Sequence, residues 1–112
     1  MLREIKSTQR LARLIGLRVD GTGTASILAG GHDAVLTDTG TGDYLLTFVQ
    51  PFARLPVVTI SPIGAAGDIV ATIGTVSASA VQILGWDGTD GTTAKDMDFH
   101  VLVLGYDSAD ET

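Results

Sequence analysis

The sequence predicts an all-β fold, an antiparallel β-sandwich of about eight short strands in a jelly-roll-like arrangement, and three observations support this prediction. Short runs rich in β-branched residues are separated by glycine- and aspartate-rich turn signals roughly every 8–12 residues, a spacing typical of sandwiches and barrels. No amphipathic stretch of about 12 or more residues lies between the runs, which argues against βαβ units. The chain of 112 residues is 45% apolar and 18% charged, so it can form one domain with a packed core.

The predicted strands follow one another through short connections. The first shows a clear alternation, because Ile15, Leu17 and Val19 are apolar and the residues between them are glycine or arginine. The segment 38–43 carries dense turn chemistry, with aspartate, glycine and threonine in close succession. Seven further strands are predicted over residues 24–29, 34–37, 44–49, 57–61, 69–73, 80–86 and 97–106.

Two segments of the predicted sandwich have a distinct composition. Pro51 and Pro56 lack a backbone donor and must lie in a turn or at a sheet edge, and Phe52 between them is expected to close one end of the sandwich. In the last strand, the residues from Val101 to Leu104 are apolar on both faces. We expect such a strand to be covered on both sides, either in the core or at a subunit interface.

The charge of the chain is unevenly distributed. Residues 1–18 hold five basic residues against one acid, whereas the rest of the chain holds two basic residues against twelve acids. We therefore expect two parts, a basic N-terminal arm over residues 1–18, helical or extended, and a β-sandwich domain over residues 19–112. The arm is expected to dock on an acidic surface, and a merely solvated terminus is the alternative. The predicted docking residues are Arg3, Lys6, Arg10, Arg13 and Arg18.

Several partners are not expected. The acidic body would repel the phosphates of a nucleic acid, so direct binding to nucleic acid is disfavoured. No run of about 18 apolar residues indicates a membrane span, and Arg13 and Arg18 interrupt the candidate core of a signal peptide.

The residue inventory argues against an enzyme. The chain has no cysteine, which excludes disulfides and thiolate metal sites, and none of its serines lies in a Gly-x-Ser-x-Gly setting. His32 and His100 are the two histidines, and we interpret them as a turn residue and an ordinary strand residue. No catalytic residue, metal site or cofactor is therefore predicted.

The acidic loop near residues 87–98 has two interpretations. Its aspartates resemble calcium ligands, but the closing glutamate of an EF-hand is absent and Asp-Gly is a common turn pair, so turns are favoured. Asp96 and Asp98 would share one face of a strand, which leaves a weak cation site open. Trp86 is interpreted as a packing residue at a strand end. The alternative is a sugar-stacking platform or an interface anchor, with Asp87 and Asp90 in the adjoining loop.

Two segments carry a family resemblance. Residues 37–48, followed by 51–58, resemble a β-sandwich unit of tailed-phage structural proteins, which occurs in head decoration proteins and in head or tail fibres. The closing segment 98–106 fits the same pattern. The order Gly-x-Tyr, Phe, Pro-Phe and Pro-Val-Val is also similar to H-type lectin and C1q-like sandwiches, which commonly assemble as trimers. The likeness spans residues 35–106, and no ligand residue of the lectins is carried over.

The resemblance implies a virion structural protein that is not an enzyme. We expect a capsid decoration, or cement, protein, made in the host cytoplasm, that binds the major capsid protein or other virion subunits on the capsid surface as a homotrimer. Burial of an apolar strand along a threefold axis would tie folding to assembly, and Val101, Val103 and Leu104 are the residues assigned to that interface. The alternative is a carbohydrate- or receptor-binding module of a phage fibre or tail, which would use Trp86, Asp87 and Asp90.

Overall fold

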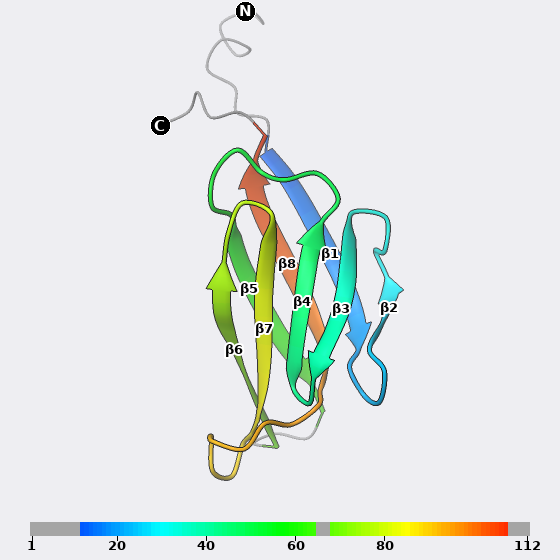
Figure 1. The fold of residues 1–112 in the computed structure, drawn as a ribbon, viewed down its shortest axis with the longest axis vertical. Helices are drawn as coiled ribbons and strands as arrows, with labels where there is room; N and C mark the ends of the chain where they lie inside the picture. The colour runs from blue at the N-terminus through cyan, green and yellow to red at the C-terminus, as the bar shows by residue number, and fades with distance from the viewer. Residues whose placement is uncertain (1–11, 65–67, 108–112) are drawn as a thin grey trace, which may run out of the picture.

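The protein is an antiparallel β-sandwich of two four-stranded sheets. The computed structural model describes residues 12–64 and 68–107, and these contain eight strands and no helix (Figure 1). The described residues therefore include no helix that could cross a membrane. The strands are β1 (Ala12–Asp20), β2 (Ser26–Ala29), β3 (Ala34–Gly40), β4 (Asp43–Phe48), β5 (Val57–Ile63), β6 (Ile69–Val76), β7 (Ala80–Asp87) and β8 (Asp98–Tyr106).

The two sheets form two layers (Figure 1). Sheet A has the order β2-β1-β8-β5 and sheet B has the order β3-β4-β7-β6, and every neighbouring pair is antiparallel. The predicted sandwich of eight strands is confirmed. The first and last strands lie side by side as they do in jelly rolls, but three hairpins keep consecutive strands in one sheet, so the strand order differs from that of a full jelly roll.

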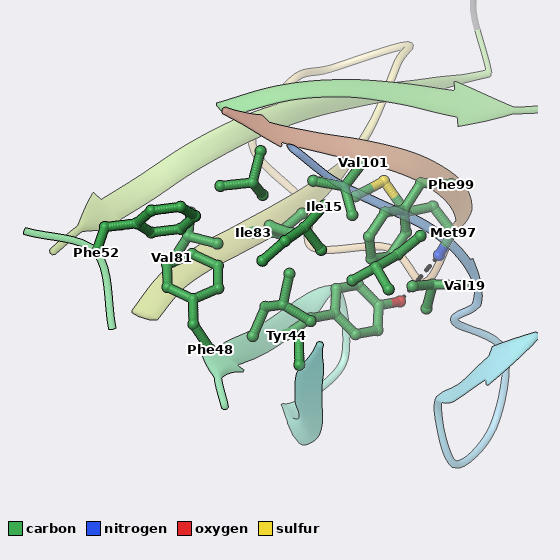
Figure 2. Packing of buried hydrophobic residues seen from close by; sticks show 14 residues of the cluster. Ile15, Val19, Tyr44, Phe48, Phe52, Val81, Ile83, Met97, Phe99 and Val101 are labelled. Atoms are coloured by element: carbon green, nitrogen blue, oxygen red, sulfur yellow. Dashed lines mark hydrogen bonds between the residues drawn. The ribbon is translucent and has the colours of Figure 1, made fainter. Parts of the chain in front are cut away.

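The hydrophobic core lies between the sheets. It forms because buried apolar residues alternate with outward residues along each central strand. In β8, for example, Phe99, Val101 and Val103 are buried while the residues between them are exposed, as expected when successive side chains point to opposite faces. Figure 2 shows the inward side chains of both sheets meeting, with the rings of Tyr44 and Phe99 5.2 Å apart. The full core comprises Ile15, Leu17, Val19, Ala34, Tyr44, Leu46, Phe48, Phe52, Val81, Ile83, Met97, Phe99, Val101 and Val103.

One buried hydroxyl joins the two sheets near the end of the sandwich that carries the connections 21–25, 41–42 and 88–97, which we call the loop end. The Tyr44 hydroxyl donates to the Gly21 carbonyl oxygen at 2.9 Å and accepts from the Met97 amide at 3.0 Å. A Cβ on Gly21 would overlap the Met97 carbonyl oxygen, so glycine is required for this close approach. Burial, followed by the neighbouring Asp96 carboxylate, raises the pKa of Tyr44 to about 12.

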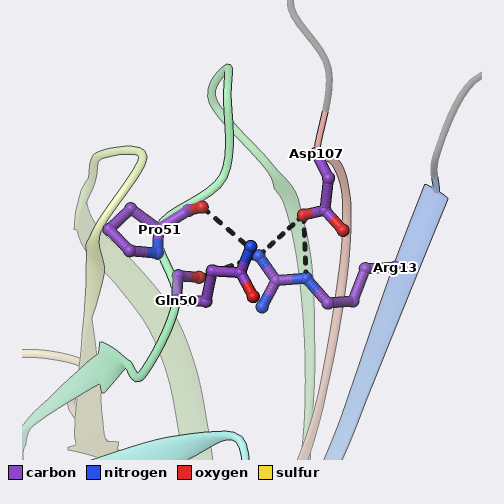
Figure 3. A network of polar contacts seen from close by, with 4 residues as sticks. All are labelled: Arg13, Gln50, Pro51 and Asp107. Atoms are coloured by element: carbon purple, nitrogen blue, oxygen red, sulfur yellow. Dashed lines mark hydrogen bonds and ion pairs between the residues drawn. The ribbon is translucent and has the colours of Figure 1, made fainter.

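The opposite end of the sandwich is closed by Phe52 and Arg13. Phe52 is buried with its ring edge-on to Phe48, and the Arg13 guanidinium lies 4.2 Å above the Phe52 ring. Arg13 also donates to Asp107 Oδ1 at 2.9 Å and to the Gln50 carbonyl oxygen at 2.8 Å (Figure 3). The prediction that Phe52 closes one end of the sandwich is confirmed.

The boundary predicted at residue 18 is wrong. Strand β1 begins at Ala12 and pairs with β8 along its length, from Ala12 opposite Tyr106 to Val19 opposite Phe99. The sandwich therefore includes residues 12–18, because these residues supply a central strand of sheet A. Of the predicted arm residues, Arg3, Lys6 and Arg10 lie outside the described residues.

Candidate interaction surface

The outer face of sheet A carries an apolar row that crosses three strands. Leu14 on β1 lies opposite Leu104 on β8, and Leu104 lies opposite Val57 on β5. All three side chains are more than two-fifths exposed, at 64%, 43% and 68% respectively. Three large apolar side chains in register form a continuous exposed strip rather than scattered surface residues.

A second row extends this strip. Gly16 lies opposite Leu102, and Leu102 lies opposite Thr59. A Cβ on Gly16 would come within 3.3 Å of a Leu102 methyl group, so the Leu102 side chain leans across the β1 backbone at the glycine. We call the surface formed by Leu14, Gly16, Val57, Leu102 and Leu104 the apolar face.

Two of the three residues predicted for a trimer interface lie elsewhere. Val101 and Val103 point between the sheets and are 1% and 0% exposed, so they are core residues and cannot contact another subunit. Leu104 belongs to the apolar face. Within this chain β8 is covered on its inner side, whereas Leu102 and Leu104 are exposed on its outer side, so the predicted cover by a subunit interface stays a prediction there.

On the outer face of sheet A, the charged residues lie in the row next to Gly16 and Leu102. Arg18 and His100 are paired across β1 and β8, are exposed, and form the third row with Ser61. Arg18 is exposed, and its role in docking stays a prediction. Arg13 is not freely available, because its guanidinium is held by Asp107, two carbonyl oxygens and the Phe52 ring.

The outer face of sheet B has a different chemistry. Trp86 lies opposite Val70, and its indole N–H donates to Thr72 Oγ1 at 2.7 Å. Gln82 Nε2 donates to Asp43 Oδ1 at 3.1 Å. These side chains satisfy one another, so this face already has the internal hydrogen bonds of a solvated surface.

The loop that follows Trp86 is held by its own aspartates. Asp87 Oδ1 accepts from the amide and hydroxyl of Thr89, and Asp90 accepts from the amides of Thr92 and Thr93 and from the Thr93 hydroxyl. These hydrogen bonds, led by those to the Thr89 and Thr92 amides, lower the pKa of both carboxyl groups. The aspartates therefore act as turn residues, in agreement with the preferred sequence interpretation.

The possible cation site has no structural support within residues 12–64 and 68–107. Asp96 Oδ1 accepts from the Gly42 amide at 2.8 Å, and Asp98 Oδ1 accepts from the Gly21 amide at 3.1 Å, so each carboxylate has a backbone partner. Asp96 also precedes β8 instead of lying on it. No three histidine, aspartate or glutamate side chains in these ranges are placed to hold a metal ion.

The two histidines lie on different elements of the fold. His32 is exposed in the turn between β2 and β3, and His100 is exposed on the outer face of sheet A. Neither has a nucleophilic serine among its hydrogen-bond partners within the described residues. Comparison with protein-family models, curated proteins and solved structures finds no match to the chain in any of the three.

Sequence reasoning missed most of the apolar face. It identified Leu104 but not Leu14, Val57 or Leu102, because the three strands that carry them are distant in the sequence. A signal was present, since each strand places an apolar residue at an outward position of its alternation. Only the register of β1, β8 and β5 brings those positions into one row.

Proposed function

We propose that this protein is a non-enzymatic structural protein of a virus particle, which binds the capsid surface as a decoration protein and stabilises it. The observation that supports the proposal best is the apolar face, because a small domain that exposes such a surface has its function in contacts with other subunits. The resemblance to tailed-phage structural proteins is the reason for proposing a virus particle as the assembly to which the protein binds. The major capsid protein is the proposed partner.

The docking contact is proposed to be electrostatic. Arg3, Lys6 and Arg10 precede the sandwich, and Arg18 is exposed on sheet A. Added cationic contacts to an acidic shell would hold the domain in place and increase the interface area that resists internal pressure. The homotrimer stays a prediction, and Leu104 is the residue assigned to its interface that is exposed. The two-fold pairing proposed below uses the same residue and is an alternative to the trimer.

Binding to undecorated capsid shells tests this function by co-sedimentation at low and moderate salt. The full chain is compared with the variant Arg3→Glu, Lys6→Glu, Arg10→Glu, which leaves β1 intact. We expect the full chain to sediment with the shells and the variant to stay in solution, with binding weakened by salt. Equal binding of both proteins would disprove the docking arm, and absence of binding by the full chain would disprove the decoration role.

A carbohydrate-binding module of a fibre or tail is the second candidate. Trp86 on the outer face of sheet B, beside the preorganised loop 87–95, is the observation that favours it. An aromatic ring next to rigid polar groups is a common platform for sugars. A glycan-array signal that is lost on Trp86→Ala would favour this candidate over decoration.

A further inference from the structure

We propose that two copies of this chain pair face to face through the apolar face of sheet A, with antiparallel strands and a two-fold axis. This contact is formed in the absence of any capsid and goes beyond the decoration role. The occupant of the apolar face is thus a second copy of the same chain.

The size of the sheet supports a stable contact. The four strands of sheet A hold nine, nine, seven and four residues, and at about 3.3 Å per residue and 4.8 Å between strands they give an outer face with a projected area of roughly 460 Å². Its accessible area exceeds this projection because side chains project from it. It is therefore of the order of the roughly 800 Å² per partner that specific interfaces bury. The polar row of Arg18, His100 and Ser61 borders the apolar rows on one side, as part of a polar rim.

The charge of the chain favours this face for contact between copies. Each copy carries a net charge of −6, so two copies repel each other wherever carboxylates meet. Within residues 12–64 and 68–107, the first three rows of the sheet A outer face hold no carboxylate. The nearest acids on that face, Asp20 and Asp98, lie at the loop end and accept hydrogen bonds from Thr22 and Gly21.

The sheet edges are poorly suited to the contact. The edge strand β5 contains Pro62, which has no amide to donate, and the other edge strand, β2, has four residues. Short edge strands and edge prolines are the usual means of preventing strand addition. Two copies that meet at sheet A would therefore do so through its outer face and not through its edges.

The distribution of charge also selects the orientation. If the strands of the two copies ran parallel, the row that holds Arg18 and His100 would face the same row of the other copy. A two-fold axis across the strands, between the Leu14 row and the Gly16 row, instead places each apolar row on the other. It places the row of Arg18 and His100 of one copy over the Ala12–Tyr106 row of the other, so that the two basic rows do not meet. Such a self-matching contact closes as a dimer.

The mass of the full chain in solution, measured by sedimentation velocity over a range of concentrations without capsid, tests the pairing. We expect a dimer for the unmodified chain and a monomer for Leu14→Lys, Leu104→Lys, with at least about a hundredfold weaker association, since four lysines would enter one apolar contact. The matched control on sheet B is Val35→Lys, Val70→Lys, because Val35 and Val70 are 57% and 44% exposed. It should remain dimeric.

A second measurement avoids introducing charge. The chain has no cysteine, so Leu102→Cys and Val70→Cys each carry a single thiol. Packed sheets lie about 10 Å apart, and a bismaleimide of that reach should link two copies of Leu102→Cys but not of Val70→Cys. Equal linking of both variants, a monomeric or trimeric unmodified chain, or a dimer that survives the sheet A lysines would overturn the pairing. Because no capsid is present, these results are independent of the co-sedimentation result.

Discussion

The outer faces of the two sheets have the same strand geometry but different chemistry. On sheet B, Trp86 is bonded to Thr72 and Gln82 is bonded to Asp43, so polar atoms are satisfied within the face. On sheet A, the corresponding central positions hold Leu102 and Leu104, which have no polar atoms and are exposed. The comparison teaches that polar side chains on the outer face of sheet B bond to one another, whereas the central outer positions of sheet A are apolar and exposed.

The largest expected effect separates the two sides of β8. Val103→Asp would bury an unpaired carboxylate in the core, so we expect a loss of at least about 4 kcal/mol in the free energy of unfolding. Leu104→Asp places the same carboxylate on the outside and should change this free energy by less than about 0.5 kcal/mol in the monomer. Urea unfolding of dilute protein measures both, and similar losses for the two variants would contradict the assigned orientation of β8.

The next effect concerns the inner side of sheet B. Tyr44→Phe removes the hydroxyl that serves the Gly21 carbonyl and the Met97 amide, and leaving them unpaired should cost about 1–3 kcal/mol in the free energy of unfolding. Leu45→Ala, on the outward side of the same strand, is the control. A negligible effect of Tyr44→Phe would show that these two hydrogen bonds contribute little to stability.

The same hydroxyl predicts a dependence on alkaline pH. The pKa of Tyr44 is raised to about 12 in the folded protein, above the usual value of 10.0, so its stabilising contribution is complete below pH 10. Between about pH 10 and 12 the unfolded state releases the proton first, and stability should fall. Tyr44→Phe should show a smaller fall in unfolding free energy over that range, and parallel curves would contradict the assignment.

A smaller effect is expected on the outer face of sheet B. Trp86→Phe keeps an aromatic ring but loses the hydrogen bond to Thr72, which should cost about 0.5–1 kcal/mol. A double-mutant cycle with Thr72→Val should give a coupling of the same size. Association between copies should remain unchanged. Weaker association of Trp86→Phe would indicate that the contact lies on sheet B and not on sheet A.

The smallest effect belongs to an exposed ion pair. Lys95 Nζ lies 3.5 Å from Asp68 Oδ1, and both side chains are substantially exposed. Lys95→Ala should change the free energy of unfolding by no more than about 0.5 kcal/mol, because water and salt screen the pair. Thermal unfolding at low and high salt checks this expectation, and a large salt-dependent loss would give the loop a structural role that its exposure does not suggest.

The candidate site was predicted in part. The basic residues that continue to residue 18 predict an arm of that length, but pairing with β8 starts the sheet at Ala12. Arg13 was assigned to docking from its charge, and its contacts with Phe52 and Asp107 depend on segments about 40 and 94 residues away. Sequence proximity carries no information about such contacts.

The sequence by itself determined the class of fold and the positions of the eight strands, because alternation and turn residues are local properties. It also determined the alternation of β8, with Phe99, Val101 and Val103 on one side. It did not determine which side faces inward between Val101 and Leu104, because both sides are apolar there. The tertiary structure decided that point, since strand register alone aligns Leu104 with Leu14 and Val57 on the outside of sheet A.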